Sequence, residues 1–264
     1  MVKLSCATLS FEGFGETNFD KTFRMAPEIG YNHVEFNCWY PFAMTPSMMR
    51  SLKERCAETG LSPAAIHLSG GLGGDVCKDF CHKLWAMQAI RALGGRRVVT
   101  SGYARGQDGG IDSVIRSLRP LVPAAEELDV LICLENHYQN NLETIEDYRR
   151  IFEAIQSRHI GICIDTGHFD ASGVDMDALI DEFSHKVNHI HLKENSGVGK
   201  KKFTRFGEGT TNNRHIVERM ISLGYEGYLS VELSPEIGEH DGRPFTPADL
   251  DLPYKLFSVY VNRP

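Results

Sequence analysis

The feature that most constrains the fold is an alternation of short apolar runs with longer stretches of helical periodicity, which continues through the whole 264-residue chain. Such alternation is typical of βα units around a parallel sheet. Eight runs are predicted to be strands, at residues 4–11, 33–38, 64–69, 97–102, 130–137, 160–165, 187–193 and 228–234. Eight helices are predicted at residues 19–29, 45–59, 78–93, 111–128, 142–155, 176–185, 211–223 and 247–261.

The number of these units selects the architecture. Eight strands and eight helices fill the chain, and no linker or low-complexity tract interrupts the series. A closed barrel of roughly 250 residues is therefore favoured over an open doubly wound sheet or two domains. We predict an α/β protein with a single (β/α)8 TIM barrel domain over residues 1–264.

Composition and charge restrict the partners. Hydrophobic residues make up 42% of the chain and charged residues 24%, as in a soluble globular protein with a substantial core. The formal net charge of −7 would repel a polyanion, so we expect no nucleic acid partner. No run reaches the ~18 apolar residues of a membrane helix, and the first residues lack a signal-peptide layout. We expect a cytoplasmic protein with no membrane partner, and leave a homo-oligomer open.

Ionisable residues stand at the ends of the last four predicted strands. They are Glu135, Asp165, His191 and Glu232. Side chains alternate across a strand, so the apolar neighbours Leu134, Ile164 and Leu192 would face the outer helices and the ionisable set would face the barrel interior. The carboxyl ends of barrel strands form the active-site face. We therefore expect these four side chains to converge at the barrel mouth.

Three carboxylates at such a place would repel one another unless a cation or protons compensated them. We predict one divalent metal ion with Glu135, Asp165, His191 and Glu232 as its ligands. Three oxygen ligands and one imidazole suit Mn²⁺, Mg²⁺ or Co²⁺, with Zn²⁺ as another option, and leave two octahedral positions for a bidentate substrate. The alternative interpretation is a set of separate buried salt bridges.

Five short motifs carry a family resemblance. They are Leu134-Glu135-Asn136-His137, Asp165-Thr166-Gly167-His168, His189-Ile190-His191-Leu192-Lys193, Gly207-Glu208-Gly209 and Val231-Glu232. Together they resemble the xylose isomerase-like barrel superfamily, which contains sugar isomerases and epimerases, inosose dehydratases, 3-dehydroshikimate dehydratases and endonuclease IV. The motifs span roughly the last half of the chain. The resemblance implies the same four metal ligands, and a substrate contact through His168.

The resemblance implies a divalent-metal-dependent isomerase or epimerase of a small sugar or polyol ketone, which acts through a metal-stabilised enediolate. In the ketohexose epimerases that the chain resembles, the two glutamates double as acid and base, which gives these roles to Glu135 and Glu232. Those epimerases carry an arginine six residues beyond the metal histidine, where this chain has Gly197. The departure argues against a strict ketohexose 3-epimerase.

Three other activities are weighed against an isomerase. The Glu-x-His and His-x-Lys pairs also resemble 3-dehydroshikimate dehydratases, so dehydration of 3-dehydroshikimate or an inosose is the alternative reaction. A barrel that only binds a sugar is the non-enzymatic alternative. Endonuclease IV needs further histidines after strand four and an Asp-x-His before the Gly-x-Gly motif, and the chain lacks both. Abasic-site cleavage is therefore not expected.

Further residues are predicted to contact the substrate. His137 and Lys193 each lie two positions beyond a predicted ligand and should point into the mouth. His67 lies on the third predicted strand. Arg105 follows the fourth strand and either binds a substrate carboxylate through a bidentate pair or belongs to an exposed turn.

Aromatic and lysine-rich segments flank the predicted strand ends. Aromatic rings that could stack on a sugar are Phe11, Phe14, Trp39, Tyr40 and Phe42. The loop at 196–202 contains three lysines and either caps an anionic substrate or remains a solvated lysine run. His189 is interpreted as a core histidine outside the site.

Overall fold

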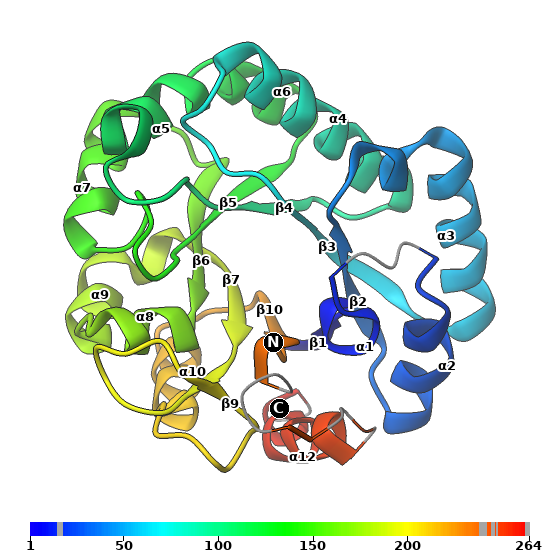
Figure 1. The fold of residues 1–264 in the computed structure, drawn as a ribbon. Helices are drawn as coiled ribbons and strands as arrows, with labels where there is room; N and C mark the ends of the chain where they lie inside the picture. Colours follow the sequence, from blue (N-terminus) through cyan, green and yellow to red (C-terminus); the bar gives the residue numbers. More distant parts are fainter. Residues whose placement is uncertain (15–17, 238–241, 244–245, 247, 262–264) are drawn as a thin grey trace.

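The computed structural model describes residues 1–14, 18–237, 242–243, 246 and 248–261, and its strands close into a barrel (Figure 1). The strands are parallel and pair around the ring in the order β1-β10-β7-β6-β5-β4-β3-β2, with β2 returning to β1. Their bounds are β1 (Lys3–Ala7), β2 (His33–Cys38), β3 (Ser62–Leu68), β4 (Arg97–Thr100), β5 (Leu131–Glu135), β6 (Ile160–Asp165), β7 (Val187–Leu192) and β10 (Tyr228–Val231). The predicted α/β class and (β/α)8 TIM barrel are confirmed.

Helices surround the ring of strands (Figure 1). They are α1 (Leu9–Glu12), α2 (Asp20–Ile29), α3 (Pro46–Thr59), α4 (Val76–Leu93), α5 (Gly110–Leu118), α6 (Leu121–Glu127), α7 (Ile145–Ala154), α8 (Thr166–Ser172), α9 (Met176–Phe183), α10 (Asn213–Ser222) and α12 (Ala248–Phe257). Short 3-10 turns lie at Pro41–Met44, Gln107–Gly109, Ser184–Lys186 and Ser258–Tyr260. Within the described residues, no helix is long and apolar enough to cross a membrane.

The observed elements differ from the predicted ones mainly at their ends. The first strand ends at Ala7, because the side-chain oxygen of Asn37 accepts the N–H of Leu9 and the chain turns into α1. The predicted helix at 111–128 divides into α5 and α6 around Pro120, which has no N–H to continue the helical hydrogen bonds. Residue 247, the predicted start of the last helix, lies outside the described residues.

Besides α1, helix α8 and a hairpin after β7 were not predicted. The side chain of Asp165 accepts the N–H of His168 at 2.8 Å, and this cap starts helix α8 directly after β6. After β7, a small antiparallel hairpin pairs β8 (Glu194–Asn195) with β9 (Phe203–Thr204). Both elements bring side chains to the carboxyl ends of the strands.

A cluster of small apolar side chains lies in the barrel interior. The cluster consists of Ala65, Val99, Cys133 and Cys163, all fully buried. Three of these residues stand two positions before His67, Glu135 and Asp165, so they face the same interior and lie one layer deeper. This apolar cluster forms the floor on which the polar residues rest.

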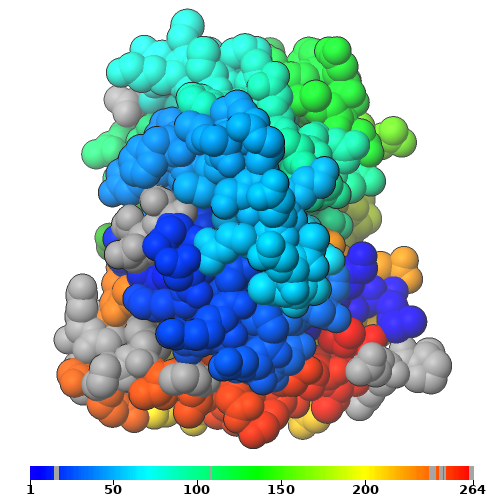
Figure 2. All heavy atoms as spheres, turned by 90° about the vertical axis from the view of Figure 1, so that its right-hand side faces the viewer, coloured from blue at the N-terminus to red at the C-terminus, as the bar shows by residue number. Residues whose placement is uncertain are grey.

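The last helix packs beside the first part of the chain. The Tyr31 hydroxyl donates to the backbone oxygen of Leu250 at 3.1 Å, and the Tyr31 and Tyr254 rings meet edge to face. Figure 2 shows the same arrangement from outside, with the red C-terminal segment directly below the blue surface of the N-terminal part of the chain. The α12 helix therefore covers the ring where its first and last strands pair.

Candidate metal centre

The four predicted metal ligands meet inside the barrel. Glu135 and Asp165 end β5 and β6, His191 lies on β7, and Glu232 directly follows β10. These strands are neighbours in the ring, and all four side chains are buried. Each residue offers one ligand atom, and the four atoms lie within 4.8 Å of one another. The structure therefore brings together the complete predicted ligand set.

The imidazole of His191 lies at the centre of the set. Its Nδ1 atom is 2.7 Å from Glu135 Oε1 and 2.9 Å from Glu232 Oε2. Asp165 Oδ2 is farther away, at 3.9 Å. The three carboxylates thus point toward one ring nitrogen from three sides.

A lysine ammonium lies among the same carboxylates. Lys193 Nζ is 2.7 Å from Asp165 Oδ2 and 3.1 Å from Glu232 Oε1. It also lies 4.9 Å from the centre of the Phe203 ring on β9. Lys193 is therefore a buried cation whose charge offsets part of the acidic cluster.

The electrostatics of the cluster keep both predicted acid/base glutamates ionised. Burial alone would raise the pKa of Glu135, but His67, His137 and His191 outweigh it and hold that pKa well below the usual value. Burial also opposes ionisation of Glu232, yet Lys193 and His191 lower its pKa to about 2.

Asp165 behaves differently from the glutamates. Burial raises the pKa of Asp165, against the opposing effect of Lys193 and with help from the charge on Glu232. The same carboxylates raise the pKa of Lys193 in spite of its burial. At neutral pH, Lys193 is thus a cation beside two ionised glutamates.

Three more histidines lie beside the cluster, and two of them contact Glu135. His137 Nε2 and His67 Nε2 approach Glu135 Oε2 at 2.8 and 3.0 Å. The ring of His168 stacks on that of His137, with 4.1 Å between centroids. Burial, together with the charges of His137 and Lys193, holds the pKa of His168 well below its usual value. His168 is therefore a neutral ring.

A cavity of about 240 Å³ opens above the cluster. Five of the predicted site residues line it: His67, His137, His168, Lys193 and Glu232. The rest of the wall is Leu9, Phe14, Trp39, Leu68, Ser69, Gly70, Ser101, Lys201, Phe203, Ser234 and Glu236. Glu135, Asp165 and His191 are fully buried and lie outside this wall. Histidine side chains, Lys193 and Glu232 therefore lie between these three residues and the cavity.

The structure does not bring Arg105 into this cavity. Its guanidinium binds Asp147 at 2.8 and 3.3 Å and the backbone oxygen of Asn140 at 2.9 Å. Arg105 therefore joins the loop after β4 to the start of α7. Its predicted role as a substrate-binding residue is not retained, because these partners occupy the groups that would grip a carboxylate.

The segments that flank the mouth are divided between the cavity and the surface. Phe14 and Trp39 line the cavity, whereas Phe11 is buried in the core. Tyr40 and Phe42 stack on each other at the surface, outside the cavity wall. Of the three lysines at 200–202, Lys201 reaches the wall, where its Nζ lies 3.1 Å from Glu236.

A buried glutamate on β2 was not predicted from the sequence. Glu35 is fully buried, and its Oε1 lies 2.9 Å from His191 Nε2. Residues 33, 35 and 37 share one face of β2, so the alternation applied to the later strands would have indicated an inward-facing charge here. His189, set aside as a core histidine, binds the other oxygen of Glu35 at 2.5 Å.

The donor set fits a divalent cation. Three carboxylates and one imidazole converge. Asp165 Oδ2 lies beside Lys193 Nζ and Glu232 Oε2 lies beside His191 Nδ1, but in the described part of the chain neither oxygen makes a well-aligned hydrogen bond. Buried carboxylate oxygens of this kind are costly unless they bind a cation or a donor. The residues present therefore suit a bound metal, with Glu35, His67, His191 and Glu232 forming a second, overlapping group.

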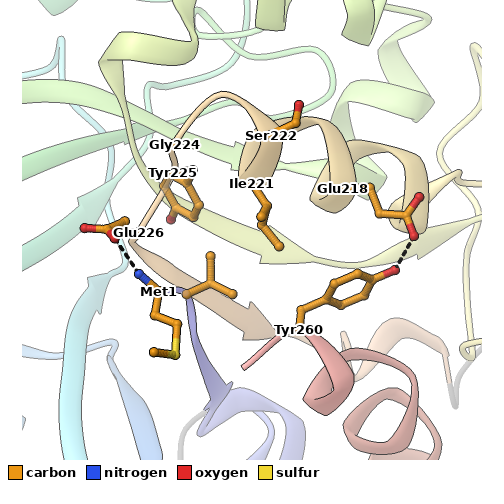
Figure 3. Close-up of a pocket in the computed structure, with 9 residues that line it drawn as sticks. Met1, Glu218, Ile221, Ser222, Gly224, Tyr225, Glu226 and Tyr260 are labelled. Carbon is orange, nitrogen blue, oxygen red and sulfur yellow. Dashed lines mark hydrogen bonds and ion pairs between the residues drawn. The ribbon is translucent and has the colours of Figure 1, made fainter. Parts of the chain in front are cut away.

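A larger cavity lies at the other end of the barrel (Figure 3). It has a volume of about 600 Å³ and is lined by Met1, Val2, Glu218, Ile221, Ser222, Gly224, Tyr225, Glu226 and Tyr260. Its wall includes the segments that precede β1 and β10, and none of the predicted site residues. Active sites of (β/α)8 barrels lie at the carboxyl ends of the strands, so the smaller cavity is the candidate site.

Known proteins share this fold and sequence pattern. A family model described as xylose isomerase-like TIM barrel matches residues 23–248. An inosose dehydratase of Geobacillus thermodenitrificans (strain NG80-2) is 26% identical over 255 residues, which cover 83% of this chain and 83% of the dehydratase. An L-ribulose 3-epimerase structure matches with a TM-score of 0.79 at 19% identity, over 98% of this chain and 94% of the epimerase. The IOLI protein, solved with a zinc atom, matches with a TM-score of 0.78 at 20% identity, over 98% of each chain.

Proposed function

Because the chain belongs to the xylose isomerase-like TIM barrel family, we propose that it is a divalent-metal-dependent isomerase or epimerase of a small sugar or polyol ketone. The observation that carries the proposal is the placement of two ionised carboxylates, Glu135 and Glu232, at the same ring nitrogen of His191, beneath a cavity of about 240 Å³. The names of the matched L-ribulose 3-epimerase and inosose dehydratase agree with a small polyhydroxylated substrate.

Glu135, Asp165, His191 and Glu232 would hold the metal. A divalent cation at such a set supplies Lewis acidity, which lowers the energy of negative charge on a substrate oxygen. The oxygen-rich donor set favours Mn²⁺, Mg²⁺ or Co²⁺, and the zinc atom in the IOLI protein keeps Zn²⁺ as a candidate.

Glu232 is the carboxylate that contacts the cavity directly. Its low pKa keeps it ionised, so it can accept a proton from a carbon beside a substrate carbonyl. Glu135 reaches the cavity through His137 and His67, whose Nε2 atoms contact its Oε2. Glu232 therefore acts as one acid/base group, and Glu135 acts as the second by accepting and returning a proton through these imidazoles. One group would remove the proton from the substrate carbon to give an enediolate, and the other would return a proton to it.

The cavity wall would orient the substrate. The neutral ring of His168 and the hydroxyls of Ser69 and Ser101 offer hydrogen bonds to sugar oxygens. Phe14 and Trp39 provide the apolar faces that sugar rings stack on. A volume of about 240 Å³ lies below the usual range for drug-sized ligands, so the substrate is expected to be small.

Dehydration of an inosose or of 3-dehydroshikimate is the second candidate reaction. It is favoured by the buried Lys193 ammonium in the cavity wall and by the 26% identity to an inosose dehydratase. In this reaction one side chain removes a proton, and a protonated group such as Lys193 assists the loss of hydroxide. A barrel that binds a sugar without turnover is the third outcome that an experiment must separate.

Solvent exchange separates these candidates. The metal-loaded protein is incubated in D₂O with a panel of ketoses, inososes and 3-dehydroshikimate, and NMR follows deuterium at the carbon beside the carbonyl. An isomerase or epimerase should introduce deuterium and interconvert ketoses, and Glu232→Gln should abolish both. Glu236→Gln is the matched control, because it makes the same change in the cavity wall outside the ligand set.

Two results would contradict the proposal. Formation of a conjugated, ultraviolet-absorbing product without ketose interconversion would assign the chain as a dehydratase. Saturable binding of a sugar with no exchange and no product would assign it as a binding protein.

A further inference from the structure

Glu35 on β2 is a buried charge that the proposed acid/base chemistry does not use. Its strand is not a neighbour of β7, yet its carboxylate crosses the barrel interior to reach the histidines of that strand. Oε1 lies 2.9 Å from His191 Nε2, and Oε2 lies 2.5 Å from His189 Nε2. The side chain is fully buried and lies outside the cavity wall. A role in contacting substrate is therefore not available to it.

The two nitrogens of the His191 ring face opposite ways. Nδ1 faces Glu135, Glu232 and Asp165, whereas Nε2 faces Glu35. A neutral imidazole carries one proton, so an imidazole that binds a cation through Nδ1 must keep its proton on Nε2. That proton needs an acceptor, and Glu35 Oε1 is the carboxylate within reach of it.

The contact between His191 and Glu35 is close but is not aligned as a hydrogen bond. His191 Nε2 and Glu35 Oε1 are close, but within the described residues neither atom makes a hydrogen bond of good geometry. The strong contact with His189 holds Glu35 from its other oxygen, and His67 Nδ1 lies 3.6 Å from Oε1. Glu35 is thus anchored independently of the ligand set and can set the orientation of the His191 ring.

We propose that Glu35, anchored by His189, is a positioning residue that holds His191 with Nδ1 directed at the metal. The inference rests on the proposed function only in requiring that the four-residue set binds a divalent cation. Carboxylates that accept the N–H of a ligand histidine fix its tautomer, and losing them typically weakens metal binding 10–100-fold.

A second ion on the Glu35 side is the competing explanation, because Glu35, His67, His191 and Glu232 also lie close together. It would require Glu35 to exchange its contact with His189 for a metal. It would also place a second cation at Nε2 of the His191 ring, whose Nδ1 already faces the first cation. The number of ions bound per chain decides between a positioning carboxylate and a ligand.

The experiment measures Co²⁺ binding to the intact chain by calorimetry and by the visible Co²⁺ absorption spectrum. Glu35→Gln keeps the size of the side chain but removes its charge. It should bind one ion 10–100-fold more weakly and with an altered spectrum. Glu35→Asp should recover part of the affinity. His189→Gln leaves the four proposed ligands in place and removes the partner of Glu35 Oε2, although the His189 ring also lies edge to face with that of His191 at 5.2 Å. It should weaken binding in the same direction. Cys133→Ala is the control for loosening the barrel interior, and should bind as the parent does.

The outcomes are distinct. Unchanged affinity and spectrum in Glu35→Gln and His189→Gln would overturn the inference and leave the proposed function intact. Two ions in the parent and one in Glu35→Gln would also overturn it, by making Glu35 a ligand. If Glu35→Gln does not fold, Glu35→Asp and His189→Gln decide the question together, because His189 also packs on the His191 ring. A parent chain that binds no divalent ion would overturn the proposed function itself.

Discussion

The protonation state of His191, one of the four proposed ligands, depends on the residues around it. Burial alone would lower its pKa, but Cys163, Glu35 and the glutamates of the cluster raise it well above the usual value. The imidazole is therefore protonated when no metal is bound, and its positive charge offsets the carboxylates on either side. A metal ion and the proton then compete for the same ring nitrogen, Nδ1.

This competition predicts a pH dependence of metal affinity. Below the raised pKa of His191, binding must displace the Nδ1 proton, so affinity should increase with pH by up to about tenfold per unit. Calorimetry in buffers of different ionisation enthalpy should detect about one proton released per Mn²⁺ near pH 7. Affinity that stays constant from pH 6 to pH 8, with no proton release, would show that His191 does not ligate the ion through Nδ1.

At the scale of elements, the loop after β4 and the start of α7 are joined by side chains. Asp147 accepts the backbone N–H of Thr144 at 2.8 Å, and the N–H of Asp147 is satisfied by the Thr144 hydroxyl, which together make a capping box. Arg105 adds a bidentate contact to the same carboxylate. The arginine thus stabilises a helix end beside the barrel mouth.

Substitution of Arg105 tests this structural role. Arg105→Ala should lower stability by about 1 kcal/mol, because the arginine is partly exposed and solvent screens the pair. Asp147→Ala should cost about 2 kcal/mol, since it also removes the side chain that accepts the N–H of Thr144 in the capping box. Thermal unfolding measures both changes, and the KM for the substrate should stay at the parent value. A raised KM in Arg105→Ala with unchanged stability would restore a substrate-binding role.

The sequence predicted the elements and the convergence of Glu135, Asp165, His191 and Glu232 because both depend on local periodicity. The alternation in residues 131–135 and 187–192 indicates which side chains face inward without knowledge of the neighbouring strands. Arg105 shows the limit of such reasoning, because its acceptor lies 42 residues away in a segment that no local pattern relates to it. Helix α8 was missed because it depends on one cap from Asp165 rather than on apolar spacing.

In the molecule as a whole, the proposed ligand set connects four neighbouring strands, which form one half of the barrel. Its residues come from β5, β6, β7 and β10, which are consecutive in the ring, and Glu35 extends the contacts to β2 on the far side. Without a metal, the protonated His191 and the Lys193 ammonium still offset the carboxylates. The chain is therefore expected to stay folded after chelation, with lower stability.

The last prediction concerns the unfolding temperature with and without metal. A ligand present at 100 times its dissociation constant stabilises the folded state by about 2.7 kcal/mol. For a chain of this length, that corresponds to a rise in unfolding temperature of about 5 °C. Calorimetry should show this rise when Mn²⁺ is returned to protein treated with a chelator. Asp165→Asn should lose it while keeping the cap on α8, because an asparagine oxygen can still accept the N–H of His168. Glu236→Gln should retain the full rise, and an equal rise in Asp165→Asn would show that the stabilising ion binds elsewhere on the barrel.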